Sequence, residues 1–261
     1  MAISLANAIK SVKEDEHWVK KVLIGGVITA IAGAAGTVMQ AEDISVVPRV
    51  ISIITYLIFG AFLSGFLVST ANKVINSDSN SMAEWSENNL LIRGLKFILS
   101  VLVYCIVITL MFVLISIALS VVIGIVLGIL YFLIITLMQL DAQVLSPLII
   151  VVSGAFGIVF GLYFMQFVNA AYTSYYQSLD FRKLMSFKKH FRMIKENQHA
   201  AWTLIGKEIL YFLLFVLAII IACITIVGIL AVPFISFAAY ITLVNLKAQY
   251  AKEIEIGKYF E

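Results

Sequence analysis

Charge is what this sequence has least of. Charged residues make up 13% of its 261 residues, whereas hydrophobic residues make up 62%. Soluble domains usually carry about 25% charged and about 45–50% apolar residues. With so few charges, the surface of a folded chain of this length would be too apolar for a water-soluble protein. Much of that apolar surface must therefore face lipid. The composition excludes an ordinary soluble domain and indicates an integral membrane protein.

Cysteine and histidine are also scarce, with 2 and 3 residues. Cys105 and Cys223 lie in separate apolar segments, where a thiol is a small packing residue, and they form no disulfide framework. His17, His190 and His199 share no metal-ligand spacing. There is also no phosphate-binding loop and no nucleophile with an adjacent base. The sequence therefore predicts a protein that is not an enzyme, with no metal site and no cofactor.

A cleaved signal peptide is not expected either. The first apolar segment begins at about Val22, after a polar stretch that carries Glu14, Asp15 and Glu16. The stretch before the apolar part of a signal peptide is short and basic, which this one is not. We therefore interpret residues 22–39 as a retained membrane span.

Long apolar segments dominate what is present. A helix needs about 20 apolar residues to cross a bilayer, and lipid offers its backbone no hydrogen-bond partners outside the helix. We expect an all-α fold, a polytopic transmembrane helical bundle with interfacial amphipathic helices. Its apolar segments are 22–40, 47–71, 95–140, 147–177, 202–222 and 225–247.

The basic residues lie in alternate connections between these segments. Cations cluster at 10–21, 73–96, 182–207 and 247–258, whereas the turns at 40–49, near Asp141 and near Thr225 have few or none. Because cations favour the cytoplasmic side, we predict a multi-pass protein of the cell membrane with about six crossings and both termini in the cytoplasm.

Segment 95–140 is the difficult one, because it is long enough for two crossings. Two crossings would make seven in all and would put the most basic loop outside. With one crossing, the remaining residues would lie along the outer interface, re-enter the membrane, or extend one very long helix.

The layout suggests a three-unit internal repeat. In each unit a polar segment with one tryptophan leads into a helical hairpin, and Trp18, Trp85 and Trp202 are predicted interfacial anchors. Each unit also ends near an asparagine, at Asn72, Asn169 and Asn245. The predicted parts of one membrane domain are an interfacial N-terminal helix at 1–21, a first hairpin at 22–71, a longer unit at 76–177, a basic amphipathic helix at 180–199, a third hairpin at 202–248 and a polar tail at 249–261.

Three stretches carry a resemblance to a known family. They are residues 16–26 (EHWVKKVLIGG), residues 85–96 (WSENNLLIRGLK) and residues 226–234 (IVGILAVPF) with their continuation to Tyr250. Together they resemble the uncharacterised polytopic membrane family known as domain of unknown function 4013. A proline–glycine pair that the family has after its first span is replaced here by Glu42-Asp43. The resemblance implies a membrane location and this organisation, but neither an activity nor functional residues.

The basic segment at 180–197 is the best single candidate for a binding surface. As one helix it would place Phe181, Leu184, Phe187, Phe191 and Ile194 on one face. The cations on the other side would be Arg182, Lys183, Lys188, Lys189, Arg192 and Lys195. Such a helix lies in the headgroup plane, where each cation near an anionic leaflet contributes about 1 kcal/mol. The segment is thus either a surface for anionic lipid or an anchor that only sets the orientation of the chain.

Small and polar residues inside the apolar segments support two further hypotheses. The pairs Gly124 with Gly128 and Gly157 with Gly161 have the GxxxG spacing of close helix packing, either inside the bundle or in a dimer. Polar side chains at Thr136, Ser153, Gln166 and Asn169 either line a polar path or hydrogen-bond to neighbouring helices. No ionisable residue lies in the middle of a segment, where proton-coupled transporters commonly need one.

We therefore expect a non-enzymatic, lipid-interacting scaffold or a membrane subunit of a larger assembly. Its partners would be membrane lipids and either further copies of itself or other membrane subunits, and not nucleic acid, since the membrane explains the basic segment. The alternative is a transporter or channel for a small or apolar solute.

Overall fold

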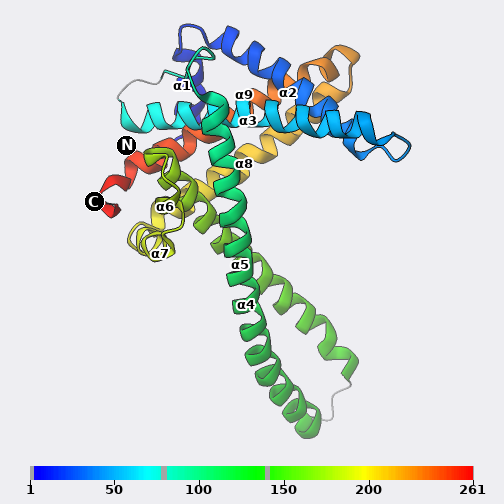
Figure 1. Cartoon of the computed structure of the whole chain (residues 1–261). Helices are drawn as coiled ribbons and strands as arrows, with labels where there is room; N and C mark the ends of the chain where they lie inside the picture. Colours follow the sequence, from blue (N-terminus) through cyan, green and yellow to red (C-terminus); the bar gives the residue numbers. More distant parts are fainter. Residues whose placement is uncertain (1–2, 78–80, 139–141, 261) are drawn as a thin grey trace.

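A computed structural model describes residues 3–77, 81–138 and 142–260, and within these ranges every regular element is a helix (Figure 1). The helices are α1 (Leu5–Glu14), α2 (Trp18–Gln40), α3 (Val46–Asn76), α4 (Leu90–Met138), α5 (Ala142–Ser178), α6 (Phe181–Leu184), α7 (Phe187–Glu196), α8 (Gln198–Cys223), α9 (Ile226–Glu253) and a final 3₁₀ helix, η1 (Ile256–Tyr259).

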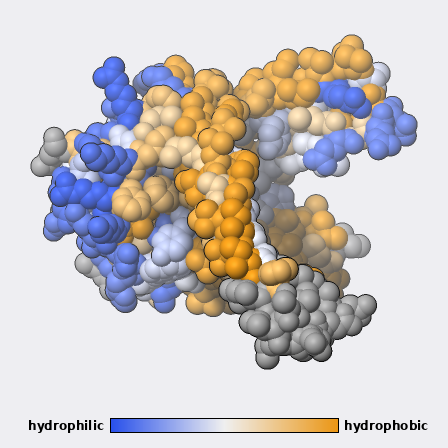
Figure 2. Space-filling model, turned by 90° about the horizontal axis from the view of Figure 1, so that it is seen from below, coloured by the Kyte–Doolittle hydropathy of each residue, from blue (hydrophilic) through white to orange (hydrophobic). Residues whose placement is uncertain are grey.

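Six of these helices, α2, α3, α4, α5, α8 and α9, are long and apolar enough to cross a membrane. This confirms the all-α polytopic fold. Figure 2 shows where the remaining polarity lies: most hydrophilic residues gather on one side of the molecule, a smaller group lies at the tip of one arm, and the surface between them is largely apolar.

Within the apolar segment 95–140, all the residues that the structure describes (95–138) belong to one helix. α4 runs without a break for 49 residues. At 1.5 Å per residue it is about 70 Å long, more than twice the bilayer core of about 30 Å. A continuous helix cannot cross twice, so the alternative with seven crossings is wrong and the very long helix is what the chain forms. With α5, α4 projects as an arm away from the hairpins α2–α3 and α8–α9 (Figure 1).

α3 and α4 approach each other most closely at two glycines. A Cβ atom on Gly65 would overlap the backbone carbonyl of Leu90, and one on Gly94 would overlap the carbonyl of Ala61. Only residues without a side chain let two helix backbones come this near. The two glycines therefore set where α4 crosses α3.

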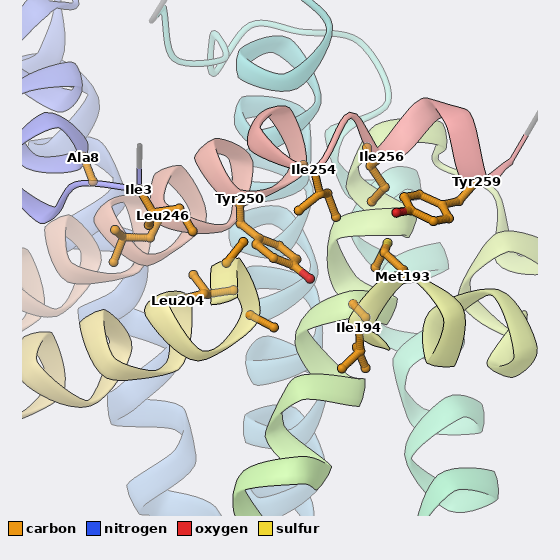
Figure 3. Packing of buried hydrophobic residues seen from close by; sticks show 14 residues of the cluster. Ile3, Ala8, Met193, Ile194, Leu204, Leu246, Tyr250, Ile254, Ile256 and Tyr259 are labelled. Atoms are coloured by element: carbon orange, nitrogen blue, oxygen red, sulfur yellow. The ribbon is translucent and has the colours of Figure 1, made fainter. Parts of the chain in front are cut away.

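The hairpins and both ends of the chain meet in a group of buried apolar clusters, which we together call the hub. Figure 3 shows one of its apolar clusters, to which α1, α7, α8, α9 and η1 contribute; its labelled members are Ile3, Ala8, Met193, Ile194, Leu204, Leu246, Tyr250, Ile254, Ile256 and Tyr259. The Ile3 amide donates to Glu253 Oε2 at 2.9 Å, and the Ser4 amide donates to Gln249 Oε1 at 2.9 Å. The N-terminal and C-terminal segments therefore lie side by side.

Both terminal segments differ from their predictions, because both contribute to this cluster. In segment 249–261, predicted to be a polar tail, the described residues 249–260 are largely buried or half-buried, because α9 continues to Glu253 and because Ile254 and Ile256 are only 1% and 2% exposed. Segment 1–21 is not one interfacial helix. It comprises α1, which buries Ala8 and Val12, and the beginning of α2.

Candidate functional site

The basic segment forms two short helices instead of the single helix predicted for 180–199. α6 begins after Asp180, whose Oδ1 accepts from the Arg182 amide at 2.8 Å and caps the helix. The chain turns at Met185 and Ser186, after which α7 begins at Phe187, and α8 already begins at Gln198. The turn lets Leu184 and His190 both reach the hub, where each is completely buried.

The turn also changes which side chains α6 and α7 bury. Of the predicted apolar face, Leu184 and Ile194 are buried, but Phe181 and Phe191 are 41% and 59% exposed. In α7 the buried positions are instead His190, Met193 and Ile194. The five residues predicted to share one face therefore do not share one environment, because the chain forms two helices and not one unbroken helix.

The outer side of α7 combines cations with an exposed aromatic ring. Phe191 and Arg192 are adjacent; Lys188 comes three and four residues before them and Lys195 four and three residues after them, and all four are exposed. We call these four residues the basic face. Arg182 is exposed on the adjoining α6.

The other two predicted cations turn towards the C-terminal segment. The Nζ atoms of Lys183 and Lys189 lie 5.4 and 5.1 Å from the centre of the Phe260 ring. Both distances are within the range of cation–π attraction. Of the basic face itself, Arg192 Nε is 2.7 Å from Glu196 Oε1, so its charge is partly compensated.

His190 attaches α7 to the hub. Its ring lies edge-on to Tyr104 with centroids 6.3 Å apart, and 6.2 Å from the centroid of the Phe260 ring. Neither ring nitrogen has a hydrogen-bond partner among the described residues. Burial lowers the pKa of His190 to about 4, and the nearby backbone of Lys183 opposes this only in part. The neutral imidazole therefore holds the basic face in place at neutral pH.

A second candidate site is a cleft of about 400 Å³ between α5, α8 and α9. Its walls are apolar and consist of Phe164, Met165, Val168, Ile209, Phe212 and Leu243. Three of them also contribute to the outer surface: Met165, Ile209 and Phe212 are 38%, 42% and 60% exposed. The cleft therefore opens onto the apolar surface of helices that are long enough to span a membrane.

The polar residues of the cleft are Asn169, Glu208 and Lys247. Lys247 Nζ lies 3.5 Å from Glu208 Oε1, with side chains only 15% and 10% exposed. Asn169 Nδ2 donates to Glu208 Oε2 at 2.5 Å, and Lys247 Nζ lies 4.9 Å from the centre of the Tyr172 ring. The cleft thus contains one positive and one negative charge that are nearly excluded from solvent.

Sequence reasoning singled out Asn169 but missed Glu208 and Lys247, which look like charges near the ends of two apolar segments. The feature of the sequence that could have indicated these two residues is a pair of opposite charges on the two helices of one predicted hairpin. That feature becomes useful only when the register of the hairpin is known, because register decides which residues of α8 and α9 face each other.

A family model described as "Protein of unknown function (DUF4013)" matches residues 49–232, which is more than half of the chain. The chain belongs to the DUF4013 family. No curated protein and no solved structure matches it. The match confirms the family resemblance seen in the sequence and includes α6, α7 and Glu208. It assigns no activity to a DUF4013 protein.

The tryptophans of this DUF4013 protein have different surroundings. Trp85 stacks on Phe66 with ring centroids 4.0 Å apart and donates from Nε1 to the Lys21 carbonyl at 3.1 Å, so it belongs to the packing of the hub. Trp18 is half-buried against the same cluster. Trp202 is 38% exposed beside Tyr163 and keeps the exposure that an interfacial anchor needs.

The predicted glycine seams make no contact within the described part of this chain. A Cβ atom on any of Gly124, Gly128, Gly157 or Gly161 would meet no described atom within 4 Å. All four lie on the projecting arm of α4 and α5, where close packing inside the bundle is not seen. The close helix contact that the structure does show is at Gly65 and Gly94 instead.

Among the described residues of the predicted polar path, Ser153 is not brought together with Gln166 and Asn169. Gln166 and Asn169 are buried at 3% and 5% exposure, whereas Ser153 is exposed on the arm. Thr136 lies outside the described side chains. Asn169 does hydrogen-bond to a neighbouring helix, as the other interpretation of these residues predicts, since its partner Glu208 is on α8.

Proposed function

We propose that this protein is a non-enzymatic, multi-pass protein of the cell membrane that binds anionic lipid headgroups through the basic face of α7. In this role it is a lipid-interacting scaffold or a membrane subunit of an assembly. The observation that carries the proposal is the exposed Phe191 ring between the exposed cations Lys188, Arg192 and Lys195.

The combination suits the boundary between water and lipid. An aromatic ring prefers the headgroup region, and each cation near an anionic leaflet contributes about 1 kcal/mol. The opposite side of α7 is already packed on the hub through His190, Met193 and Ile194. Binding therefore need not order a disordered segment, which would otherwise subtract from the affinity.

The charge distribution supports a cytoplasmic position for this face and for both termini. The first and last segments hydrogen-bond to each other at the hub, which supports an even number of crossings, because both termini then lie on the same side. Anionic lipids are concentrated in the cytoplasmic leaflet, and cations of multi-pass proteins favour the same side.

Lipid selectivity of the reconstituted full chain tests the proposal. Spin-labelled phosphatidylglycerol and phosphatidylcholine would be compared for association with the wild type by electron spin resonance. We expect a several-fold preference for phosphatidylglycerol that falls as salt is added, because ions screen exposed charges. The double variant K188Q/K195Q should bring the preference close to unity.

A matched control removes two exposed lysines elsewhere. The variant K13Q/K20Q loses the same charge from the N-terminal segment and α2, and should keep most of the preference. If the wild type shows no preference, α7 is only an anchor that sets orientation. If both variants lose the preference equally, net charge and not the basic face is responsible, and the proposal fails.

A transporter or channel for a small or apolar solute is the alternative function. It receives less support, because the described residues do not bring Ser153 together with Gln166 and Asn169 into a continuous polar path.

A further inference from the structure

We infer that the cleft between α5, α8 and α9 binds a single-chain lipid whose head is uncharged and carries hydroxyl groups, as in a monoacylglycerol. The inference is independent of the basic face, because the two sites share no residue.

The walls of the cleft favour a hydrocarbon chain. Six of the nine lining residues are apolar, and Phe212 and Ile209 continue from the cleft onto the exposed surface of α8. A chain that enters from the surrounding lipid would stay in contact with apolar side chains along its length. Each methylene that it buries contributes about 0.8 kcal/mol.

The charges in the cleft favour an uncharged head. Lys247 and Glu208 have opposite charges and face the same space, so a carboxylate attracted by one would be repelled by the other, and an amine likewise. A hydroxyl group suits both, since it can donate to the Glu208 carboxylate and accept from the Lys247 ammonium. The charge of the cleft therefore selects against lipids with a single net charge.

The ion pair has hydrogen-bonding capacity left for such a head. Its 3.5 Å separation exceeds the roughly 2.7–2.9 Å of a strong charge-assisted hydrogen bond. Among the described residues, Asn169 donates a hydrogen bond to Glu208, whereas a carboxylate has about four acceptor positions. A hydroxyl group that lies beside the pair can accept from Lys247 Nζ and donate to Glu208 Oε1 at the same time.

Size argues for one chain and a small head. A volume of about 400 Å³ is near the lower end of the roughly 300–1,000 Å³ range of small-molecule sites. Only three lining residues are polar, which is enough for one or two hydroxyl groups but offers a phosphate a single cation beside an acid.

Photolabelling of the full-length protein in amphipol tests this assignment. The probe is a monoacylglycerol with a diazirine in its chain, and labelled peptides are located by mass spectrometry. We expect labelling on α5, α8 and α9. Unlabelled 1-oleoylglycerol should compete at a concentration at least tenfold lower than oleate or oleylamine, which have the same chain.

Two tryptophan variants show whether the label enters the cleft. V168W fills the cleft and should abolish labelling, whereas L213W adds the same side chain at a position on α8 that is 60% exposed and should leave labelling unchanged. Equal labelling of both variants, or label only outside these helices, would overturn the assignment.

Two charge variants test the choice of head, and they compare ligands within one protein, so a loss of stability does not imitate the result. E208Q leaves Lys247 without its acid and should make oleate the best competitor, with a gain of at least tenfold. K247Q should shift the preference to oleylamine. The inference is wrong if oleate and oleylamine reduce labelling of the wild type as effectively as 1-oleoylglycerol does. It is also wrong if neither variant changes the order of preference, because the paired charges then do not select the head group.

Discussion

Lys21 Nζ lies 2.9 Å from Asp15 Oδ2, and each of the two side chains is only 4% exposed. The same ammonium lies 2.5 Å from Glu84 Oε1 and donates to the Met82 carbonyl at 3.3 Å. Asp15 Oδ2 in turn accepts from the Met82 amide at 2.8 Å. One buried ion pair therefore joins the connection between α1 and α2, the first turn of α2 and the segment that precedes α4.

Replacing Asp15 by alanine should be strongly destabilising. The substitution leaves Lys21 buried with Glu84 as its remaining charged partner among the described residues, and loss of one member of a buried pair typically costs about 3–5 kcal/mol. We expect a loss of about 3 kcal/mol in the free energy of unfolding, measured by denaturation in mixed micelles. Glu16 is exposed, so E16A should change the free energy by less than about 0.5 kcal/mol. Similar values for the two variants would contradict the role of the pair.

Asp15 should also contribute to the acid sensitivity of the fold. Burial alone would raise its pKa, but hydrogen bonds from Lys21, Met82 and His17 outweigh burial and hold the pKa below the ordinary 3.8. The stabilisation is therefore complete above about pH 4 and is lost as pH falls through the pKa of the folded state. The D15A variant should lack this part of the pH dependence, in denaturation curves recorded at successive pH values.

Gly94 should not tolerate even a methyl group. In G94A the new Cβ would overlap the Ala61 carbonyl, so α3 and α4 would have to move apart, and overpacking of this kind typically costs about 1–3 kcal/mol. The matched control is G60A on α3, where a Cβ meets nothing within 4 Å. Because alanine is the better helix former, G60A should leave the thermal midpoint unchanged or raise it. Equal midpoints for both variants would mean that the close crossing does not form.

His190 should make the attachment of α7 sensitive to mild acid. Its pKa is about 4 in the folded protein against an ordinary 6.5, so the unfolded chain binds more protons between these values. Stability should therefore fall as pH falls from about 6.5 towards 4. H190L cannot be protonated and should remove this slope in thermal denaturation curves, whereas H199L, at an exposed position, should keep it. An unchanged slope in H190L would show that other groups set it.

The asparagines at the ends of the three predicted repeat units each hydrogen-bond to another element. Asn72 Nδ2 donates to the carbonyls of Tyr176 and Gln177, Asn169 donates to Glu208, and Asn245 Nδ2 donates to Ser11 Oγ. Each of the three asparagines thus joins a different element. Their chain positions were readable from the sequence, whereas their partners were not, because those partners are about 40 to more than 200 residues away.

Prediction was least accurate where the chain leaves the apolar segments. The turn at Met185 and Ser186 interrupts a pattern that fits one amphipathic helix, and the burial of Leu184 and His190 explains why. The sequence has no proline or glycine at Met185 and Ser186 that would predict the break. We infer that burying Leu184 and His190 in the hub stabilises the fold by more than the interruption of the helix destabilises it.

The sequence by itself determined that this chain consists of long apolar helices, since a backbone surrounded by lipid has few other ways to satisfy its hydrogen bonds. It also determined that the connections are basic on one side. Only the tertiary structure decided that α4 is a single helix, that the terminal segments pack together, and that Glu208 meets Lys247 in a cleft. Those features depend on helix register and on contacts between distant residues, and a local pattern of hydrophobic and charged residues carries little information about either.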